Sequence, residues 1–325
     1  MNKERLIVFI IGAGHSGSTL LSKTLNAHSK IFSVSEISQF QQDINSEIAL
    51  CGCETLLKEC DFWEDISNRV EIILGDSLKE KPYLYGINKN ISGNKLYNKL
   101  YFRFSRFVAL NLRIRTKLIK TRLEYISVLY KAIIDKTGAD AIVDSSKSAT
   151  RASILKPYLE RKGYRVKIIH LIRDGRAVFY SYKKGFYKVR VKNRTTGVDE
   201  MKTYYAENVR SDEEIVNLWK RDNRLSLLYH NLFSSSNYYQ LTYEEFVDNP
   251  KVALISLLQS INYKFESEML KLNRYTNHMV SGNASRINAT SINQPSEIWR
   301  NKLSKDQLNY FEKKAGRLNR KFGYK

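Results

Sequence analysis

The sequence is short of the residues and segments that mark several protein classes. Its 325 residues contain three cysteines, Cys51, Cys53 and Cys60, all in one short segment. A secreted disulfide scaffold needs more cysteines, spread more widely. The four prolines mark no linker, and we find neither a low-complexity stretch nor an internal repeat. These absences exclude a disulfide-rich miniprotein and a repeat array, and they leave no firm domain boundary.

Long apolar stretches are missing as well. The N-terminal apolar run, residues 6–11, is too short for a signal peptide or a membrane span. No other stretch approaches the roughly 18 apolar residues that a spanning helix needs. We therefore expect a cytoplasmic protein, and peripheral contact with a membrane stays open.

Acidic residues are outnumbered by basic ones. The chain has 33 Asp and Glu against 54 Lys and Arg, which gives a formal net charge of +21. A basic surface favours anionic partners such as nucleotides, nucleic acid, acidic glycans or an anionic membrane. A general bias towards Lys, Asn, Ile and Tyr is the alternative explanation, so charge alone selects no function. The hydrophobic fraction of 42% is enough for a core and excludes global disorder.

Short apolar runs alternate with helical patterns along the chain. The predicted strands are residues 6–11, 31–35, 141–144, 166–172 and 238–242. The predicted helices include residues 20–25, 212–229 and 250–260. A continuous apolar run suits a strand that is covered on both faces. The alternation predicts a three-layer α/β/α fold with a central parallel sheet and right-handed crossovers.

Residues from about 79 to 136 interrupt this alternation. We expect one domain over residues 1–325 with a mostly helical, basic insertion at about 79–136. Within it, residues 97–118 carry Lys and Arg but no acid, with apolar side chains at helical spacing. This pattern predicts a basic amphipathic helix. Such a helix lines an anionic acceptor groove, lies on a membrane, or packs on the core with its basic face in solvent.

The strongest local signal is a Gly- and Ser-rich turn after the first predicted strand. A turn of this composition exposes backbone N–H groups, and the following helix adds its positive N-terminal end, so the segment binds a phosphate. Its spacing is that of the Walker A loop, with Ser18 in place of the lysine. That lysine serves the β- and γ-phosphates of a triphosphate, so its loss argues against a kinase or NTPase. The candidate binding residues are Gly14, His15, Ser16, Gly17, Ser18 and Thr19.

Two other interpretations of this turn stay open. Gly12, Gly14 and Gly17 also satisfy the G-x-G-x-x-G pattern of dinucleotide-binding proteins. That pattern needs an acidic residue after the second strand, where only Glu36 is available. The second alternative is a turn with a purely structural role.

Several segments, in their order along the chain, resemble those of sulfotransferases that use 3′-phosphoadenosine 5′-phosphosulfate (PAPS). GAGHSGSTL is similar to the family's 5′-phosphosulfate loop, and VKIIHLIRDGRAVFYSYKKG resembles its 3′-phosphate segment, a strand followed by R-D-x-R-x-x-x-x-S. The family order continues with IVDSSKSATRASIL, YYQLTYEEFVDNP, HMVSGNASR and EIWRNKLS. The resemblance covers nearly the whole chain. It is closest to bacterial sulfotransferases and more distant to protein-tyrosine sulfotransferases.

This resemblance implies a fold, a donor and a reaction. The topology expected is that of P-loop kinases, the donor is PAPS, the product is 3′,5′-ADP, and no metal is required. The acceptor is expected to be a hydroxyl, first on a carbohydrate or glycolipid and second on a tyrosine or small phenol. The rival classes are a P-loop nucleotide kinase or NTPase and a protein that only binds nucleic acid or membranes; we expect no nucleic acid partner. The sequence does not give the oligomeric state.

Three residues are expected to join the loop in binding the nucleotide. Arg173 matches the family's 3′-phosphate arginine, and a guanidinium fork grips a phosphate bidentately. Ser181 adds a hydrogen bond from about two helical turns away, and Arg286 is a candidate second clamp. The alternatives are a surface ion pair of Arg173 with Asp174 and an ordinary helical serine.

Three residues are candidates for catalysis. Glu36 follows the second strand and matches the glutamate that resembles a base in tyrosine sulfotransferases. Lys147 follows the third strand, where its ammonium reaches the bridging or sulfonyl oxygens. His15 stands where relatives usually have Arg or Lys, which leaves its charge state open. The alternatives are a capping or exposed carboxylate, a solvated lysine and a histidine that only caps the loop.

The clustered cysteines offer three thiolates. A zinc site normally needs four ligands, and the C-x-C spacing is unusual for one. We therefore expect no metal site, with free thiols first and a disulfide as the alternative. No histidine shows ligand spacing, and His170 lies in an apolar strand as a core residue.

Overall fold

The computed structural model describes residues 4–75, 117–184, 186–192, 199–205, 210–230, 235–272, 277–292 and 297–325. The strands are β1 Leu6–Ile11, β2 Ile31–Ser35, β3 Ala141–Lys147, β4 Arg165–Ile172, β5 Phe186–Lys192, β6 Asp199–Tyr205 and β7 Tyr238–Thr242. The α-helices up to the centre of the chain are α1 Ser18–Asn26, α2 Phe40–Ile44, α3 Asp61–Leu74, α6 Lys117–Thr137 and α7 Ala149–Arg161. Those that follow are α8 Gly175–Lys183, α9 Asp212–His230, α10 Tyr243–Asp248, α11 Pro250–Ser260, α12 Ser285–Asn288 and α13 Lys305–Lys321. Short 3₁₀ helices are η1 Ile37–Gln39, η2 Leu57–Glu59, η3 Ser235–Asn237, η4 Ser267–Leu270 and η5 Ile298–Asn301.

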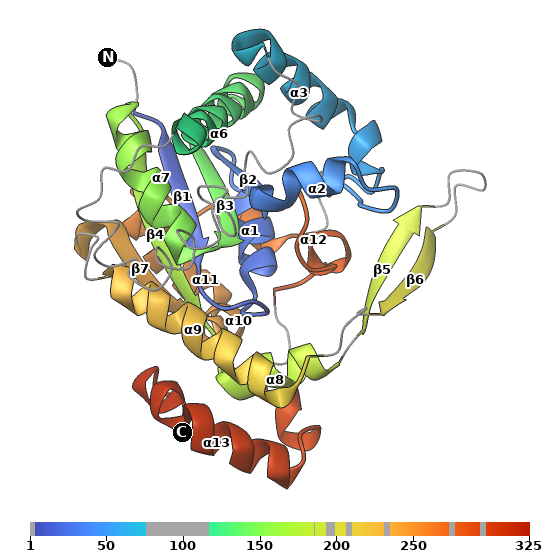
Figure 1. Cartoon of the computed structure of the whole chain (residues 1–325), viewed down its shortest axis with the longest axis vertical. Coiled ribbons are helices and arrows are strands. Elements are labelled where there is room, and N and C mark those ends of the chain that lie inside the picture. Colours follow the sequence, from blue (N-terminus) through green and yellow to red (C-terminus); the bar gives the residue numbers. More distant parts are fainter. Residues whose placement is uncertain are drawn as a thin grey trace.

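A five-stranded parallel sheet lies at the centre, in the order β2-β3-β1-β4-β7 (Figure 1). Strand β1 pairs with both β3 and β4 and is therefore covered on each side by a neighbouring strand. All six β1 side chains are buried, as expected for a strand that lies between two helical layers. Because the strands are parallel, their carboxyl ends all meet at one edge of the sheet.

The alternating side chains of β1 divide the core into two faces. Ile7, Phe9 and Ile11 pack in one apolar cluster with side chains of α3, α6 and α7. Leu6 and Val8 pack in another, with side chains of α1, α10 and α11. A third cluster joins α8, α9 and α13 around Trp219 and Phe311, and α13 lies on the outside of this layer (Figure 1). The arrangement is the predicted three-layer α/β/α fold.

The five predicted strands of this sheet are confirmed. β1, β2 and β7 begin and end where the sequence predicts, while β3 extends to Lys147 and β4 begins at Arg165. The sequence did not indicate β5 and β6, which form a separate antiparallel pair. This ribbon projects from the end of α8, away from the sheet (Figure 1).

The predicted insertion is described only in part. The basic amphipathic helix expected at 97–118 lies almost entirely outside the described residues. The C-terminal part of the insertion forms α6, which packs beside α3 and contributes Ile126, Leu129 and Ile133 to the core (Figure 1). Among the residues that the structure describes, no helix is both long and apolar enough to cross a membrane.

Candidate active site

The five parallel strands deliver the candidate residues to one edge of the sheet. The predicted phosphate loop follows β1, Glu36 follows β2, Lys147 ends β3 and Arg173 follows β4. Tyr243, which the sequence did not single out, follows β7. Sites in parallel α/β sheets form beyond the carboxyl ends of the strands, so this is the expected edge.

The phosphate loop leads directly into α1. Gly17 is the N-cap residue of α1 and has a φ of 91°, and no side chain caps the helix there. A Cβ at Gly17 would lie 2.2 Å from the ring of Tyr243, so both the backbone angle and the close approach require glycine. The hydroxyl of Ser16 donates to the carbonyl of Ala13 at 2.8 Å and closes the turn. The uncapped N–H groups at the start of α1 remain oriented to bind an anion.

Arg173 lies directly against this loop. Its Nη1 donates to the carbonyl oxygen of His15 at 3.0 Å. Its guanidinium stacks over the ring of Tyr243, 4.2 Å from the centroid, and its Nε has no hydrogen-bond partner within the described residues. Asp174, the alternative partner, is paired instead with Arg176 at 2.7 Å. Arg173 is thus oriented by backbone and ring contacts, and its remaining N–H groups keep the capacity to bind an anion.

Ser181 completes this corner of the site. Its Oγ lies 3.0 Å from Nδ1 of His15, across from α8 to the loop. A pocket of about 140 Å³ is lined by both Ser181 and Arg173, together with Ala177, Tyr180 and Trp299. This volume is below the roughly 300 Å³ of small ligand pockets, so it suits one end of a nucleotide. The two residues predicted for the 3′-phosphate therefore share one pocket beside the loop.

His15 is held in an environment that disfavours its charged form. Burial and the positive charges of Lys147, Arg173 and Arg210 lower the pKa of His15 to about 4. Its ring also packs edge-on against Tyr182, with centroids 4.2 Å apart. This lowered pKa favours the neutral imidazole at pH 7.

Glu36 and Lys147 form an ion pair at the ends of β2 and β3. Both side chains are largely but not fully buried. Lys147 has a φ of 64°, and Ser35, next to Glu36, has a φ of 56°. Such left-handed angles at residues other than glycine are costly and concentrate at functional sites. The N–H of Gly12 donates to the carbonyl of Lys147 at 3.1 Å, which fixes this residue beside the loop.

A buried ion pair between Asp144 and Arg151 stabilises the carboxyl end of β3. Asp144 and Arg151 are fully buried, with Oδ2 and Nη1 2.7 Å apart, and Tyr130 donates to the same carboxylate. The other oxygen of Asp144 accepts from the backbone N–H of Ser146 at 2.9 Å. Asp144 therefore holds the turn that carries Lys147.

The structure gives Arg286 other contacts than those predicted. Its Nη1 donates to the carbonyl of Gly282 at 3.0 Å and its Nη2 to the carbonyl of Leu50 at 2.9 Å. These bonds brace the segment around Gly282, which lies beside Thr19 and Glu36. Its predicted role as a second phosphate clamp stays a prediction, with a bracing role as the better-supported alternative.

Asp43 is a titratable neighbour that the sequence did not indicate. Burial raises its pKa to about 6, and a hydrogen bond from Ser281 and the charge of Arg286 partly offset that effect. The negative charge of Glu36 also raises it, so the two carboxyl groups lie close enough to interact. No motif marks Asp43, because its proximity arises from the tertiary packing of α2.

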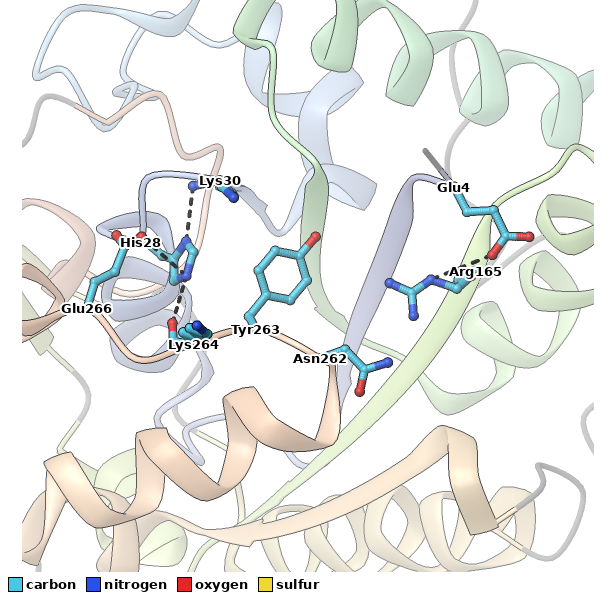
Figure 2. A pocket seen from close by; sticks show the side chains of 8 residues that line it. All are labelled: Glu4, His28, Lys30, Arg165, Asn262, Tyr263, Lys264 and Glu266. Atoms are coloured by element: carbon cyan, nitrogen blue, oxygen red, sulfur yellow. Dashed lines mark hydrogen bonds and ion pairs between the residues drawn. The ribbon is translucent and has the colours of Figure 1, made fainter. Parts of the chain in front are cut away.

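A second, larger pocket lies away from this edge. It has a volume of about 670 Å³ and is bordered by residues that precede the strands: Glu4 before β1, Lys30 before β2, and Arg165 at the start of β4 (Figure 2). Inside it, His28 is already bonded to the carbonyl of Lys264 at 3.0 Å. This pocket is at the amino ends of the strands, opposite the phosphate loop, and contains none of the predicted site residues.

A parallel sheet of this strand order, with an anion-binding loop after the first strand, defines an α/β protein of the P-loop type. The family model of the sulfotransferase domain matches residues 7–322. The chain therefore belongs to the sulfotransferase domain family and is an enzyme of the PAPS-dependent sulfotransferase class. This assignment favours sulfonyl transfer over the rival kinase and binding-protein classes.

Solved structures agree with this fold. The sulfotransferase domain from the curacin biosynthetic pathway has a TM-score of 0.54 and 16% identity, over 100% of this chain and 99% of that domain. The sulfotransferase domain from the Synechococcus PCC 7002 olefin synthase has a TM-score of 0.51 and 16% identity, over 96% and 95%. At these identities the likeness supports the fold alone. No curated protein matches the sequence.

Proposed function

We propose that this site binds PAPS between the phosphate loop and Arg173 and transfers its sulfonyl group to a hydroxyl of a carbohydrate or glycolipid. One observation carries the proposal: Arg173 Nη1 lies 3.0 Å from the carbonyl oxygen of His15, within the loop itself. An anion-binding loop and a separate guanidinium at this range suit a nucleotide with phosphates on two sides of one ribose.

The phosphate loop and the residues beside it bind different parts of PAPS. The N–H groups of residues 14–19 and the N-terminus of α1 bind the 5′-phosphosulfate, with the hydroxyls of Ser18 and Thr19 nearby. Arg173 and Ser181 bind the 3′-phosphate in the pocket they share. His15 lies between these two parts, because its carbonyl contacts Arg173 and its ring contacts Ser181.

The ion pair of Glu36 and Lys147 supplies the groups that the reaction needs. The acceptor oxygen forms a bond to sulfur while the bond from sulfur to the 5′-phosphate oxygen breaks, and 3′,5′-ADP departs with that electron pair. Glu36 takes the acceptor proton, and Lys147 leaves Glu36 to stabilise the charge that grows on the bridging oxygen. Since Lys147, Arg173 and the loop supply positive charge, we expect transfer without an added metal ion.

The acceptor class is inferred from the net charge together with the large basic insertion expected at about 79–136. An excess of 21 positive charges favours an extended, anionic acceptor such as a sulfated or carboxylated glycan. A tyrosine or small phenol is the second candidate, because Glu36 occupies the position after β2 that resembles the base of tyrosine sulfotransferases.

A transfer assay with labelled PAPS tests the proposal. The purified chain is incubated with separate panels of oligosaccharides, glycolipids, tyrosine-containing peptides and small phenols, and labelled products are separated. We expect label on sugar hydroxyls, and none with Arg173→Ala at the same donor concentration. Label only on phenols or tyrosine would refute the carbohydrate acceptor, and no transfer to any panel with no release of 3′,5′-ADP would refute the assigned site.

A further inference from the structure

The three cysteines come together with a histidine from a distant part of the chain. Cys51, Cys53 and Cys60 lie between α2 and α3, while His278 lies more than 200 residues later, before α12. Their three sulfur atoms and one imidazole nitrogen all lie within 4.8 Å of one another. Sequence spacing alone did not indicate His278, so only the fold supplies the fourth ligand.

Three of the six separations between these atoms match those of a tetrahedral metal site, and the others are at most 4.8 Å. Cys53 Sγ and Cys60 Sγ are 3.7 Å apart, Cys51 Sγ and His278 Nδ1 are 3.7 Å apart, and Cys60 Sγ and His278 Nδ1 are 3.4 Å apart. Ligands around tetrahedral zinc, with bonds of about 2.3 Å to sulfur and about 2.0 Å to nitrogen, lie about 3.5–3.8 Å from one another. The four atoms are therefore placed where a single ion contacts all of them.

A disulfide fits the same atoms poorly. All three cysteines are free, and the 3.7 Å between Cys53 and Cys60 is far longer than the roughly 2.0 Å of a disulfide bond. Any pairing would also leave one thiol and the imidazole unused. One metal ion accounts for all four ligand atoms, whereas one disulfide bond accounts for only two of them.

Backbone contacts hold the cysteine segment in this form. The N–H of Cys51 donates to the carbonyl of Thr55 at 2.8 Å, and the N–H of Glu54 donates to the carbonyl of Cys51 at 3.0 Å. Glu54 has a φ of 72°, which closes a tight turn around Cys53. A Cβ at Gly52 would lie 1.8 Å from Oδ1 of Asn277, so this glycine is needed where the two segments meet. These contacts fix the backbone that carries the three cysteines.

The surroundings of His278 orient its ring, and two of the three thiols are buried. Phe62 stacks on the imidazole with centroids 4.4 Å apart and planes 6° apart. Trp63 donates from Nε1 to the backbone carbonyl of His278 at 2.9 Å. Cys51 and Cys60 are buried. Four protein ligands in such a shell leave no open position, which is the arrangement of a structural site and not of a catalytic one.

We propose that Cys51, Cys53, Cys60 and His278 bind one structural Zn²⁺. The ion would link the segment around His278 to the start of α3, and through it would brace the active site. The next residues of that segment reach Glu36, since the N–H of Glu36 donates to the carbonyl of Val280 at 3.0 Å. Thiolates and imidazole are the ligands that zinc prefers, and a metal that contacts distant segments stabilises the folded chain.

The metal content of the intact protein tests this site directly, independent of sulfotransferase activity. Protein purified without chelator or metal-affinity resin is analysed for bound metals and for reactive thiols. We expect about one zinc per chain, with the three thiols unreactive until a strong chelator is added. Replacement by Co²⁺ is expected to give the ligand-field bands of a tetrahedral site and thiolate-to-cobalt charge transfer.

Variants locate the ion. Cys53→Ser and His278→Asn are expected to lose at least about nine-tenths of the bound zinc, whereas His230→Asn, a change of histidine on α9, retains it. If Cys53→Ser fails to fold, the cobalt spectrum and thiol titration of the wild type still decide. Thiols that react fully without chelator, a disulfide found by mass, or an equivalent of iron in place of zinc would each overturn the proposal.

Discussion

At the scale of single residues, the surroundings of His15 determine the charge of its imidazole. The resemblance to PAPS-dependent sulfotransferases implies Arg or Lys at this place in the loop, whereas this chain carries a histidine whose neighbours favour its neutral form. Burial and three nearby cations lower its pKa. In the proposed function, Arg173 and Lys147 therefore supply the positive charge at the donor, while the carbonyl of His15 contacts Arg173 and its ring contacts Ser181.

A titration of the imidazole resonances tests this description. In ligand-free protein we expect His15 to titrate with a midpoint near pH 4, as its lowered pKa requires. The unfolded chain binds this proton near its usual pKa of about 6.5, so His15 lowers the free energy of unfolding as the pH falls from there to about 4. The resonance is assigned with His15→Asn. A midpoint near 6.5 would show that the ring is exposed and that the site is formed differently.

Glu36→Gln separates the chemistry from donor binding. The amide keeps the size of the side chain but does not take a proton, so we expect turnover to fall about 10²- to 10⁴-fold. The affinity for 3′,5′-ADP is expected to stay near wild type, because Glu36 contacts Lys147 and not the phosphate pocket. Single-turnover rates and calorimetric titration measure the two quantities. Turnover equal to wild type would remove Glu36 as the base.

Among the candidate residues, those within local motifs were easier to predict than those gathered by packing. The loop was predicted from the spacing of its residues after a strand, and Arg173 and Ser181 were predicted from the resemblance of their segment to the family's 3′-phosphate segment. His278, Asp43 and Tyr243 were not, because no local pattern links them to their partners. Arg286 was predicted from its segment, yet the structure directs two of its donors to backbone carbonyls.

At the scale of elements, the turn between β1 and α1 sets the geometry of the site. Gly17 combines a left-handed backbone with the close approach of the Tyr243 ring. Gly163, between α7 and β4, has a similar φ of 85°, but no atom of the described residues lies within 4 Å of the position that a Cβ would take there. A comparison of alanine substitutions at the two glycines therefore distinguishes the energetic cost of the backbone angle from that of steric crowding.

Gly17→Ala is expected to be far more damaging than Gly163→Ala. The left-handed angle alone costs about 1–2 kcal/mol at either position. At Gly17 the added methyl also displaces Tyr243 and with it Arg173, so we expect nucleotide binding to fall at least tenfold. Chemical denaturation and calorimetry measure both effects. Equal behaviour of the two variants would show that Tyr243 does not support the loop.

The turn after β3 depends on a buried pair. Arg151→Met leaves Asp144 buried without its cation, so we expect the free energy of unfolding to fall by about 3–5 kcal/mol. Lys131→Met, which breaks the exposed pair with Asp135, is the matched control and is expected to cost less than about 1 kcal/mol. Denaturant titration compares them. A small effect at Arg151 would mean that the pair is not desolvated as its burial indicates.

At the scale of the whole molecule, the two edges of the sheet at which the strands begin and end carry different features. All five parallel strands end at the candidate site, and the large pocket in Figure 2 lies at their amino ends. The fold class was predictable because β1, which is buried on both faces, is a continuous apolar run, and because further short strands alternate with helical patterns. The ribbon of β5 and β6 was not, because the sequences of residues 186–192 and 199–205 contain no continuous apolar run.

The central claim is that the loop and Arg173 bind one nucleotide. Calorimetric titration of the purified chain with 3′,5′-ADP tests it most directly, with Arg173→Ala as the variant and Arg69→Ala, an exposed arginine on α3, as the control for lost charge. We expect Arg173→Ala to weaken binding at least tenfold, or about 1.4 kcal/mol, and Arg69→Ala to leave it unchanged. Wild-type affinity in Arg173→Ala, or no binding by the wild type, would contradict the account.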